Sequence, residues 1–200
     1  MESQEIKNLI KLMAKIPGLG PRSARRSVLN LIKNPEKLML PLAQSLIQVS
    51  ENIKLCSICG NIDSDDMCGI CKDEKRDIKT ICVVEDITDL WALERSNTYK
   101  GRYHILGGVL SAIDGINAED LRIKELINNI EKNEVKEVIL ATSATLSGQT
   151  TSFYITDLLE GMNVTISRLA QGIPIGGELD YLDDGTIGAA LDSRKILSKK

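Results

Sequence analysis

Aromatic residues and long apolar runs are both scarce in this chain of 200 residues. Aromatic side chains make up only 3%, and Trp91 and Phe153 are the only tryptophan and phenylalanine. This scarcity counts against a nucleic-acid surface built from aromatic side chains that stack on bases. No apolar stretch approaches the roughly 20 residues that a membrane-spanning helix needs, and the N-terminus lacks the continuous apolar core of a signal peptide. Because hydrophobic residues still reach 42%, we expect a cytoplasmic protein with a packed core.

Charge is divided unevenly along the chain. Residues 1–55 contain nine Lys or Arg and four acids, a net charge of +5. The whole chain carries −3, so residues 56–200 sum to −8. A basic head on an acidic body is expected when one end of a protein meets phosphate and the other meets a different partner. A solvated helix face can produce the same surplus, so charge alone does not decide the function.

Four of the five cysteines form a C-x2-C-x8-C-x2-C array, made of Cys56, Cys59, Cys68 and Cys71. Two such C-x-x-C knuckles allow four thiolates to surround one zinc ion at about 2.3 Å. Two disulfides or a redox-active pair are the alternatives, but disulfides belong to oxidising compartments. We therefore expect one structural Zn²⁺, which has no open position for an activated water. Cys82 lies in an apolar run and is expected to be a small buried residue.

A glycine-containing turn joins two expected helices in the basic head. Apolar residues recur at helical spacing from Ile6 to Met13, and Pro17 ends that helix. Gly18 and Gly20 permit a tight turn, and a second amphipathic helix follows over 23–31. This order is typical of a helix-hairpin-helix motif. Many helical hairpins use such a turn only to reverse the chain.

A helix-hairpin-helix motif binds the nucleic-acid backbone for physical reasons. Glycine allows main-chain N–H groups to approach a phosphate, and the N-terminus of the second helix attracts the same oxygens. Such contacts position the protein without reading bases, so binding is independent of sequence and sensitive to salt. The candidate DNA-binding residues are Lys15, Gly18, Gly20, Arg22, Arg25 and Arg26.

Strands and helices alternate from residue 80 onward. The pattern predicts strands over 81–85, 103–106, 138–141 and 164–167, and helices over 88–95, from Asn117 through Ile130, and over 150–159. Alternation of this kind indicates a mostly parallel sheet with helices on both faces. His104 lies between apolar residues in a predicted strand, so we expect a structural role. The hydroxyl-rich segment 142–151 is interpreted as a solvated loop, with anion binding as the alternative.

Long runs of the chain resemble the RecR family of bacterial recombination mediators. The matching runs are IPGLGPRSARR (16–26), CSICGN (56–61), CGICKDEKRD (68–77), ICVVED (81–86), YKGRYHILGGVLSAIDGI (99–116), EVILATSA (137–144) and SRLAQGIPIGGELDYLDDGTI (167–187). The resemblance implies an α/β protein of several modules. These are a helix-hairpin-helix region (1–54), a four-cysteine zinc finger (55–79), a Toprim-type α/β domain (80–172) and a short C-terminal element (173–200).

The Toprim comparison bears on catalysis. Enzymes of that fold hold Mg²⁺ with a glutamate after the first strand and a D-x-D pair after a later strand. Glu85 matches the glutamate, but residues 139–145 contain no carboxylate, and the chain also departs from the family pattern at Ser143, Ser147 and Gln149. One glutamate cannot assemble a metal site for phosphoryl chemistry.

We therefore interpret the three acids after the first Toprim strand as a partner-binding surface, as the resemblance implies. These acids are Glu85, Asp86 and Asp89. Capping of the following helix is the alternative role of Asp86.

The resemblance implies a non-enzymatic, DNA-binding factor in recombinational repair. Such a factor acts with RecO, and in some bacteria RecF, to help RecA replace single-strand-binding protein at gaps. Family members assemble as ring-like oligomers, such as tetramers, that encircle or clamp DNA. The alternatives are a Mg²⁺-dependent Toprim nuclease or primase-like enzyme, and a zinc-containing adaptor that does not touch DNA itself.

Overall fold

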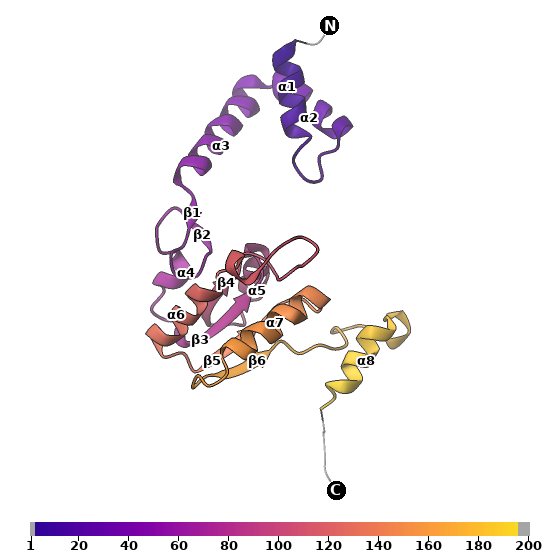
Figure 1. The fold of residues 1–200 in the computed structure, drawn as a ribbon. Coiled ribbons are helices and arrows are strands. Elements are labelled where there is room, and N and C mark those ends of the chain that lie inside the picture. The colour runs from indigo at the N-terminus through magenta and orange to yellow at the C-terminus, as the bar shows by residue number, and fades with distance from the viewer. Residues whose placement is uncertain (1–2, 196–200) are drawn as a thin grey trace. The chain divides into compact units, whose positions relative to one another are not determined.

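The computed structural model describes residues 3–195, which divide into two compact units at the junction between Ile53 and Lys54 (Figure 1). The first unit is entirely helical. It contains α1 (Gln4–Met13), α2 (Pro21–Lys33), the π-helical turn η1 (Pro35–Met39) and α3 (Leu40–Asn52). Pro21 occupies the first position of α2, where a missing backbone N–H removes no helical hydrogen bond.

Little of the first unit is buried. Its core is one face of α2, where Ala24, Val28 and Leu31 are covered. In contrast, α3 has no buried residue, and Leu46 and Val49 on this helix are each more than half exposed, at 62% and 57%. An apolar helix as open as α3 indicates a surface that meets another surface.

The second unit begins with a small cysteine-rich subdomain. Strands β1 (Lys54–Leu55) and β2 (Ile62–Asp63) pair antiparallel, and the short helix α4 (Gly69–Lys72) follows. The four cysteines of the predicted array come from the loop between these strands and from the start and end of α4.

A four-stranded parallel sheet forms the centre of the second unit (Figure 1). Its spatial order is β4 (Gly101–Ile105), β3 (Asp77–Val84), β5 (Glu137–Leu140) and β6 (Thr165–Arg168). Val83 pairs with His104 on one side and with Leu140 on the other. The parallel order confirms the predicted α/β class.

Helices cover both faces of this sheet. Alternate residues of β3 point to opposite sides, and the apolar residues on each side are buried under a helix. Ile81 and Val83 pack with α6 (Ile123–Asn133) and α7 (Leu146–Leu158), whereas Cys82 and Val84 pack against Leu90 of α5 (Ile87–Ser96). After β6, the chain continues into the 3-10 turn η3 (Leu179–Tyr181) and the helix α8 (Asp184–Asp192). Within residues 3–195, no helix combines the length and apolar character needed to cross a membrane.

The helix predicted to run from Asn117 through Ile130 is interrupted. Asn117 caps only the 3-10 turn η2 (Ala118–Asp120), in a reciprocal capping box with Asp120, and α6 begins at Ile123. The backbone N–H of Arg122 instead donates to the carbonyl of Leu106 at 3.0 Å. This long-range hydrogen bond diverts the main chain between the two helical segments.

The hydroxyl-rich segment 142–151 is a loop only in its first half, and its second half is helical. The Thr145 hydroxyl caps α7 by accepting from the backbone N–H of Gly148 at 3.1 Å. Thr150 and Thr151 then donate their hydroxyls to carbonyls four residues earlier, at 2.8 and 2.7 Å. Because hydroxyls can cap a helix or hydrogen-bond within it, a polar composition did not exclude a helix here.

Candidate zinc centre and nucleic-acid interface

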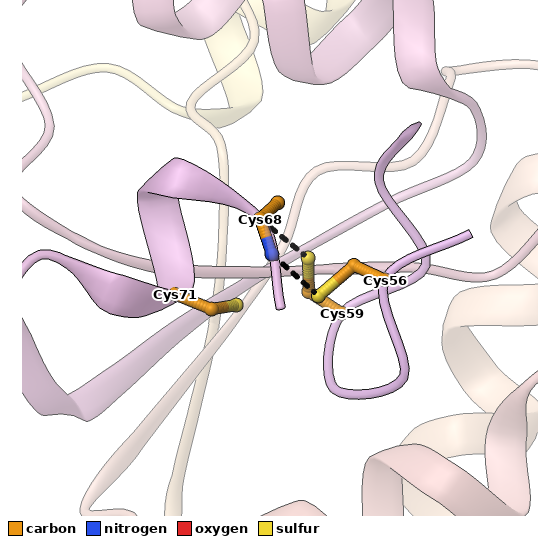
Figure 2. Close-up of side chains that lie close together, drawn as sticks. All are labelled: Cys56, Cys59, Cys68 and Cys71. Atoms are coloured by element: carbon orange, nitrogen blue, oxygen red, sulfur yellow. Dashed lines mark hydrogen bonds between the residues drawn. The ribbon is translucent and has the colours of Figure 1, made fainter. Parts of the chain in front are cut away.

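The four array cysteines converge on one point in the structure (Figure 2). Their sulfur atoms all lie within 4.8 Å of one another, and Cys59 Sγ lies 3.6 Å from Cys68 Sγ. Four sulfurs bound tetrahedrally at about 2.3 Å from a zinc ion stand about 3.8 Å apart. All five cysteines of the chain are free, so the disulfide alternative is wrong. The donor set, its number and its spacing fit zinc.

Backbone N–H groups support the sulfur ligands. Cys68 N–H donates to Cys56 Sγ at 3.3 Å, and Asn61 N–H donates to Cys59 Sγ at 3.5 Å. Such donors stabilise thiolate, the form that binds metal. The hydrogen bond with Cys59 also lowers the pKa of Cys68, and the same contact raises the pKa of Cys59. Cys82 lies outside this cluster and is buried in the sheet core, as predicted. Burial raises the pKa of its thiol to about 12.

The cysteine subdomain covers an edge of the sheet. β4 is an edge strand, and its Ile105 N–H donates to the carbonyl of Cys59 at 2.8 Å. Gly60 has φ +81°, and a Cβ there would lie 3.2 Å from the Ile105 carbonyl oxygen and 2.8 Å from Arg122 Nε. A zinc-held loop therefore occupies hydrogen-bonding positions that an open edge strand would otherwise expose.

His104 is buried beside this junction, as its predicted structural role requires. Its Nε2 lies 2.7 Å from the Arg122 carbonyl oxygen. A carbonyl only accepts, so Nε2 carries the proton of the neutral ring. Burial lowers the pKa of His104 to about 4, which keeps the ring neutral at physiological pH.

In the first unit, the turn between α1 and α2 has an open glycine surface. Gly18 adopts the left-handed conformation at φ +83°, and Leu19 N–H donates to the Ile16 carbonyl at 3.0 Å to close the turn. Gly20 is the N-cap of α2 and supplies no side-chain cap. Apart from each glycine and its two chain neighbours, no heavy atom of residues 3–195 lies within 4 Å of the position that a Cβ at Gly18 or Gly20 would take. A ligand can thus reach the backbone at the start of α2.

The basic candidates lie on exposed positions around this turn. Lys15 precedes it, and Arg22, Arg25 and Arg26 lie in the first two turns of α2. Their arrangement gives the uncapped helix N-terminus a positively charged surround. Their contact with DNA remains a prediction.

The three acidic candidates all bind backbone groups close to the carboxyl ends of β3 and β5. Asp86 accepts from Thr88 N–H at 3.2 Å, and Asp89 accepts from Asp86 N–H at 3.0 Å, which makes a capping box for α5. Capping by Asp86 is therefore confirmed, and Asp89 shares the task. Glu85 instead accepts from the N–H of Ser143. A role of these acids in binding a partner remains a prediction.

Sequence reasoning missed the role of Gly148, which lies against Ser143 and Glu85. A Cβ at Gly148 would overlap the Ser143 carbonyl oxygen and would stand 2.8 Å from Glu85 Oε1. The first turn of α7 thus packs directly on Glu85. Among residues 3–195, the four cysteines are the only cluster of three or more His, Cys, Asp or Glu side chains placed to hold a metal.

Four family models match successive segments of the chain, and the segments follow the helical unit, the cysteine subdomain, the sheet domain and the C-terminal elements in order. The matching models describe the RecR helix-hairpin-helix (6–50), the RecR zinc finger domain with four cysteines (53–73), the Toprim domain (79–170) and the RecR C-terminal region (172–195). The zinc-finger match and the converging cysteines together assign one structural Zn²⁺ to Cys56, Cys59, Cys68 and Cys71.

Curated relatives are similar in sequence to this chain over nearly its full length. Recombination protein RecR of Parvibaculum lavamentivorans is 56% identical over 191 residues, and those of Brucella anthropi and Rhizobium meliloti are each 55% identical over 193 residues. In all three cases the match covers 96% of this chain and 96% of the relative. With its helical hairpin, four-cysteine finger and parallel α/β domain in this order, the chain belongs to the RecR family of recombination proteins, which act in recombinational repair.

Proposed function

We propose that the protein is a non-enzymatic recombination mediator that binds DNA through the α1–α2 turn. It acts in the cytoplasm, at the nucleoid, with RecO and, where present, RecF, and it promotes RecA loading at single-strand gaps. The observation that carries the proposal is the uncapped N-terminus of α2, open at Gly18 and Gly20 and surrounded by basic side chains.

Phosphate fits this N-terminus for two reasons. The first backbone N–H groups of a helix have no intrahelical acceptor, and the helix dipole adds partial positive charge at the same place. Gly20 leaves those groups uncapped, and Arg22 and Arg26 bring full charges beside them. The net charge of +5 on residues 1–55 supports non-specific attraction to a polyanion.

Self-association would multiply these contacts. The apolar side chains of α3 are exposed along the helix, and a second copy of the chain is the partner proposed for them. In a ring-like oligomer such as a tetramer, several hairpins would face one DNA molecule. Weak individual contacts then add through a high effective concentration.

The enzymatic alternative lacks its ligands. Mg²⁺ sites for phosphoryl chemistry need several oxygen ligands in near-octahedral geometry. Glu85 is hydrogen-bonded to Ser143, and residues 139–145 contain no carboxylate. The acidic groups near α5 are proposed instead as part of the surface that meets RecO or RecF.

The test is binding to gapped DNA across a salt series, with mass in solution recorded in parallel. The double variant Arg22→Ala/Arg26→Ala should weaken binding. It should also flatten the plot of log affinity against log salt by about 0.7 to 0.9 for each phosphate that the variant no longer neutralises. Lys33→Ala, at the far end of α2, is the matched control and should keep the full slope. Unchanged binding by the double variant would refute the hairpin as the DNA site and favour an adaptor that reaches DNA only through its partner.

A further inference from the structure

A cavity of about 240 Å³ lies between the zinc-binding loop and α6, away from the acids at the carboxyl ends of β3 and β5. Ile58, between the first two cysteines, forms part of one wall. Asn129 and Lys132 of α6 form part of the other, and Arg102 of β4 and Glu125 of α6 are among the remaining polar lining residues.

The cavity is lined by positive and hydrogen-bonding groups that lack partners. Arg102 Nε and Asn129 Nδ2 are both buried, and neither donates a hydrogen bond within the part of the chain that the structure describes. Asn129 as a whole is only 8% exposed. Buried donors in folded proteins are normally satisfied, so residues that line the cavity hold unused hydrogen-bonding capacity, although each of these two atoms has less than 1 Å² of exposed surface.

Charge in the cavity is also unbalanced. Neither the Arg102 guanidinium nor the Lys132 ammonium forms an ion pair with any carboxylate of residues 3–195. The one acidic lining group, Glu125, lies 3.8 Å from Arg122 Nη1, so a third cation already neutralises part of its charge. The charged lining residues Arg102, Lys132 and Glu125 thus carry a net charge of +1, which a single negative charge would balance.

We propose that this cavity binds a carboxylate, presented as an acidic side chain of a partner polypeptide. A guanidinium group matches a carboxylate through two parallel hydrogen bonds. The volume is below the range of about 300–1,000 Å³ usual for small-molecule sites, and it suits a single side chain. Ile58 supplies an apolar wall for the methylene groups of a glutamate.

A nucleic-acid phosphodiester carries the same single charge, but the surroundings disfavour it. Residues 56–200 sum to −8, and an acidic body of this size repels a polyanion. One carboxylate on a peptide meets far less repulsion. The proposal is independent of DNA binding by the hairpin, which lies in the other unit.

Saturation-transfer NMR on the full, zinc-loaded chain tests the site with three probes: a glutamate blocked at both ends, dimethyl phosphate and acetate. The blocked glutamate should bind most tightly. Its affinity should fall about tenfold in Arg102→Gln and about threefold in Lys132→Gln, because each variant removes one charged donor. Lys124→Gln, also on α6 but outside the cavity, is the matched control and should bind normally.

Each other outcome overturns a defined part of the proposal. Tighter binding of dimethyl phosphate would assign the cavity to nucleic-acid backbone. Equal affinities for acetate and the blocked glutamate would refute recognition of a peptide side chain. Equal affinity in wild type, Arg102→Gln and Lys132→Gln would refute the site itself. Lys132 is exposed, so its variant keeps the test decisive if Arg102→Gln fails to fold.

Discussion

The Glu85 carboxylate accepts a hydrogen bond from the backbone N–H of Ser143, with 2.5 Å between Oε1 and nitrogen. This contact joins the end of β3 to the turn that follows β5. The carboxylate that enzymes of the Toprim fold use for metal is thereby held by the main chain. Glu85 acts here as a tether between two neighbouring strand ends, next to a helix that packs against it through Gly148.

Replacement of the Glu85 carboxylate should lower the stability of the protein. Addition of Mg²⁺ should change the stability of neither the wild type nor the variant. Glu85→Gln retains a carbonyl oxygen that can accept from Ser143 N–H but loses the charge, so we expect a decrease of about 1 kcal/mol in the free energy of unfolding. Urea unfolding of wild type and variant, each with and without Mg²⁺, measures it. If Mg²⁺ raised the free energy of unfolding of the wild type but not of Glu85→Gln, Glu85 would be a metal ligand and not a tether between strand ends.

A methyl group at Gly148 should destabilise the α/β domain. The new Cβ would overlap the Ser143 carbonyl oxygen, and backbone cannot yield as a flexible side chain does. Overpacking of this kind costs roughly 1–3 kcal/mol. Thermal unfolding of Gly148→Ala would show this loss of stability. Gly188→Ala in α8 is the control, because outside its chain neighbours and its own helix backbone no heavy atom of the described residues lies within 4 Å of a Cβ there. Equal melting temperatures of the two variants would argue against the close approach.

Loss of zinc should expose the β4 edge. Cys68→Ser removes one of four sulfur ligands, so the loop that accepts from Ile105 N–H at Cys59 loses its anchor. We expect a zinc content near zero and increased aggregation, because an uncovered edge strand can pair with other chains. Metal analysis and light scattering measure both effects. Cys82→Ser is the control and should keep its zinc; a zinc-free Cys68→Ser protein that stays soluble and fully assembled would refute this role.

Acid should destabilise the second unit through His104. Its pKa is lowered to about 4 in the folded protein, against about 6.5 in an unfolded chain. As pH falls below about 6.5 the unfolded state binds the proton first, so the stabilisation present above that pH is lost progressively down to about pH 4. The difference corresponds to roughly 3 kcal/mol.

Urea unfolding between about pH 7 and pH 4 measures this dependence, with zinc content followed in the same samples. His104→Gln can still donate to the Arg122 carbonyl but does not titrate, so its stability should change less over this interval. Identical pH profiles for wild type and variant would assign the acid sensitivity to other groups, with the zinc thiolates the first to consider.

Local patterns made much of this protein predictable. The four zinc ligands lie within residues 56–71, and the hairpin turn within 16–21. Side chains so close in sequence meet through the geometry of one or two turns, so their spacing carries the information. The alternation of strands and helices likewise predicted a parallel sheet, because hydrophobic periodicity records which face of each element is buried.

Local sequence patterns did not predict two features, the interrupted helix after Asn117 and the early start of α7. In the first case a hydrogen bond from Arg122 to Leu106 outweighs local helix propensity, and in the second a threonine cap turned an expected loop into a helix. The composition of each segment is compatible with either outcome.

The sequence by itself therefore determined the zinc ligands, the hairpin and the fold class of the sheet. Only the tertiary structure decided that Glu85 is bound by Ser143, 58 residues away, and that Arg102 and Asn129 line one cavity. The reason is physical: a sequence motif specifies contacts between near neighbours, whereas these groups are brought together by the packing of strands and helices that no local pattern encodes.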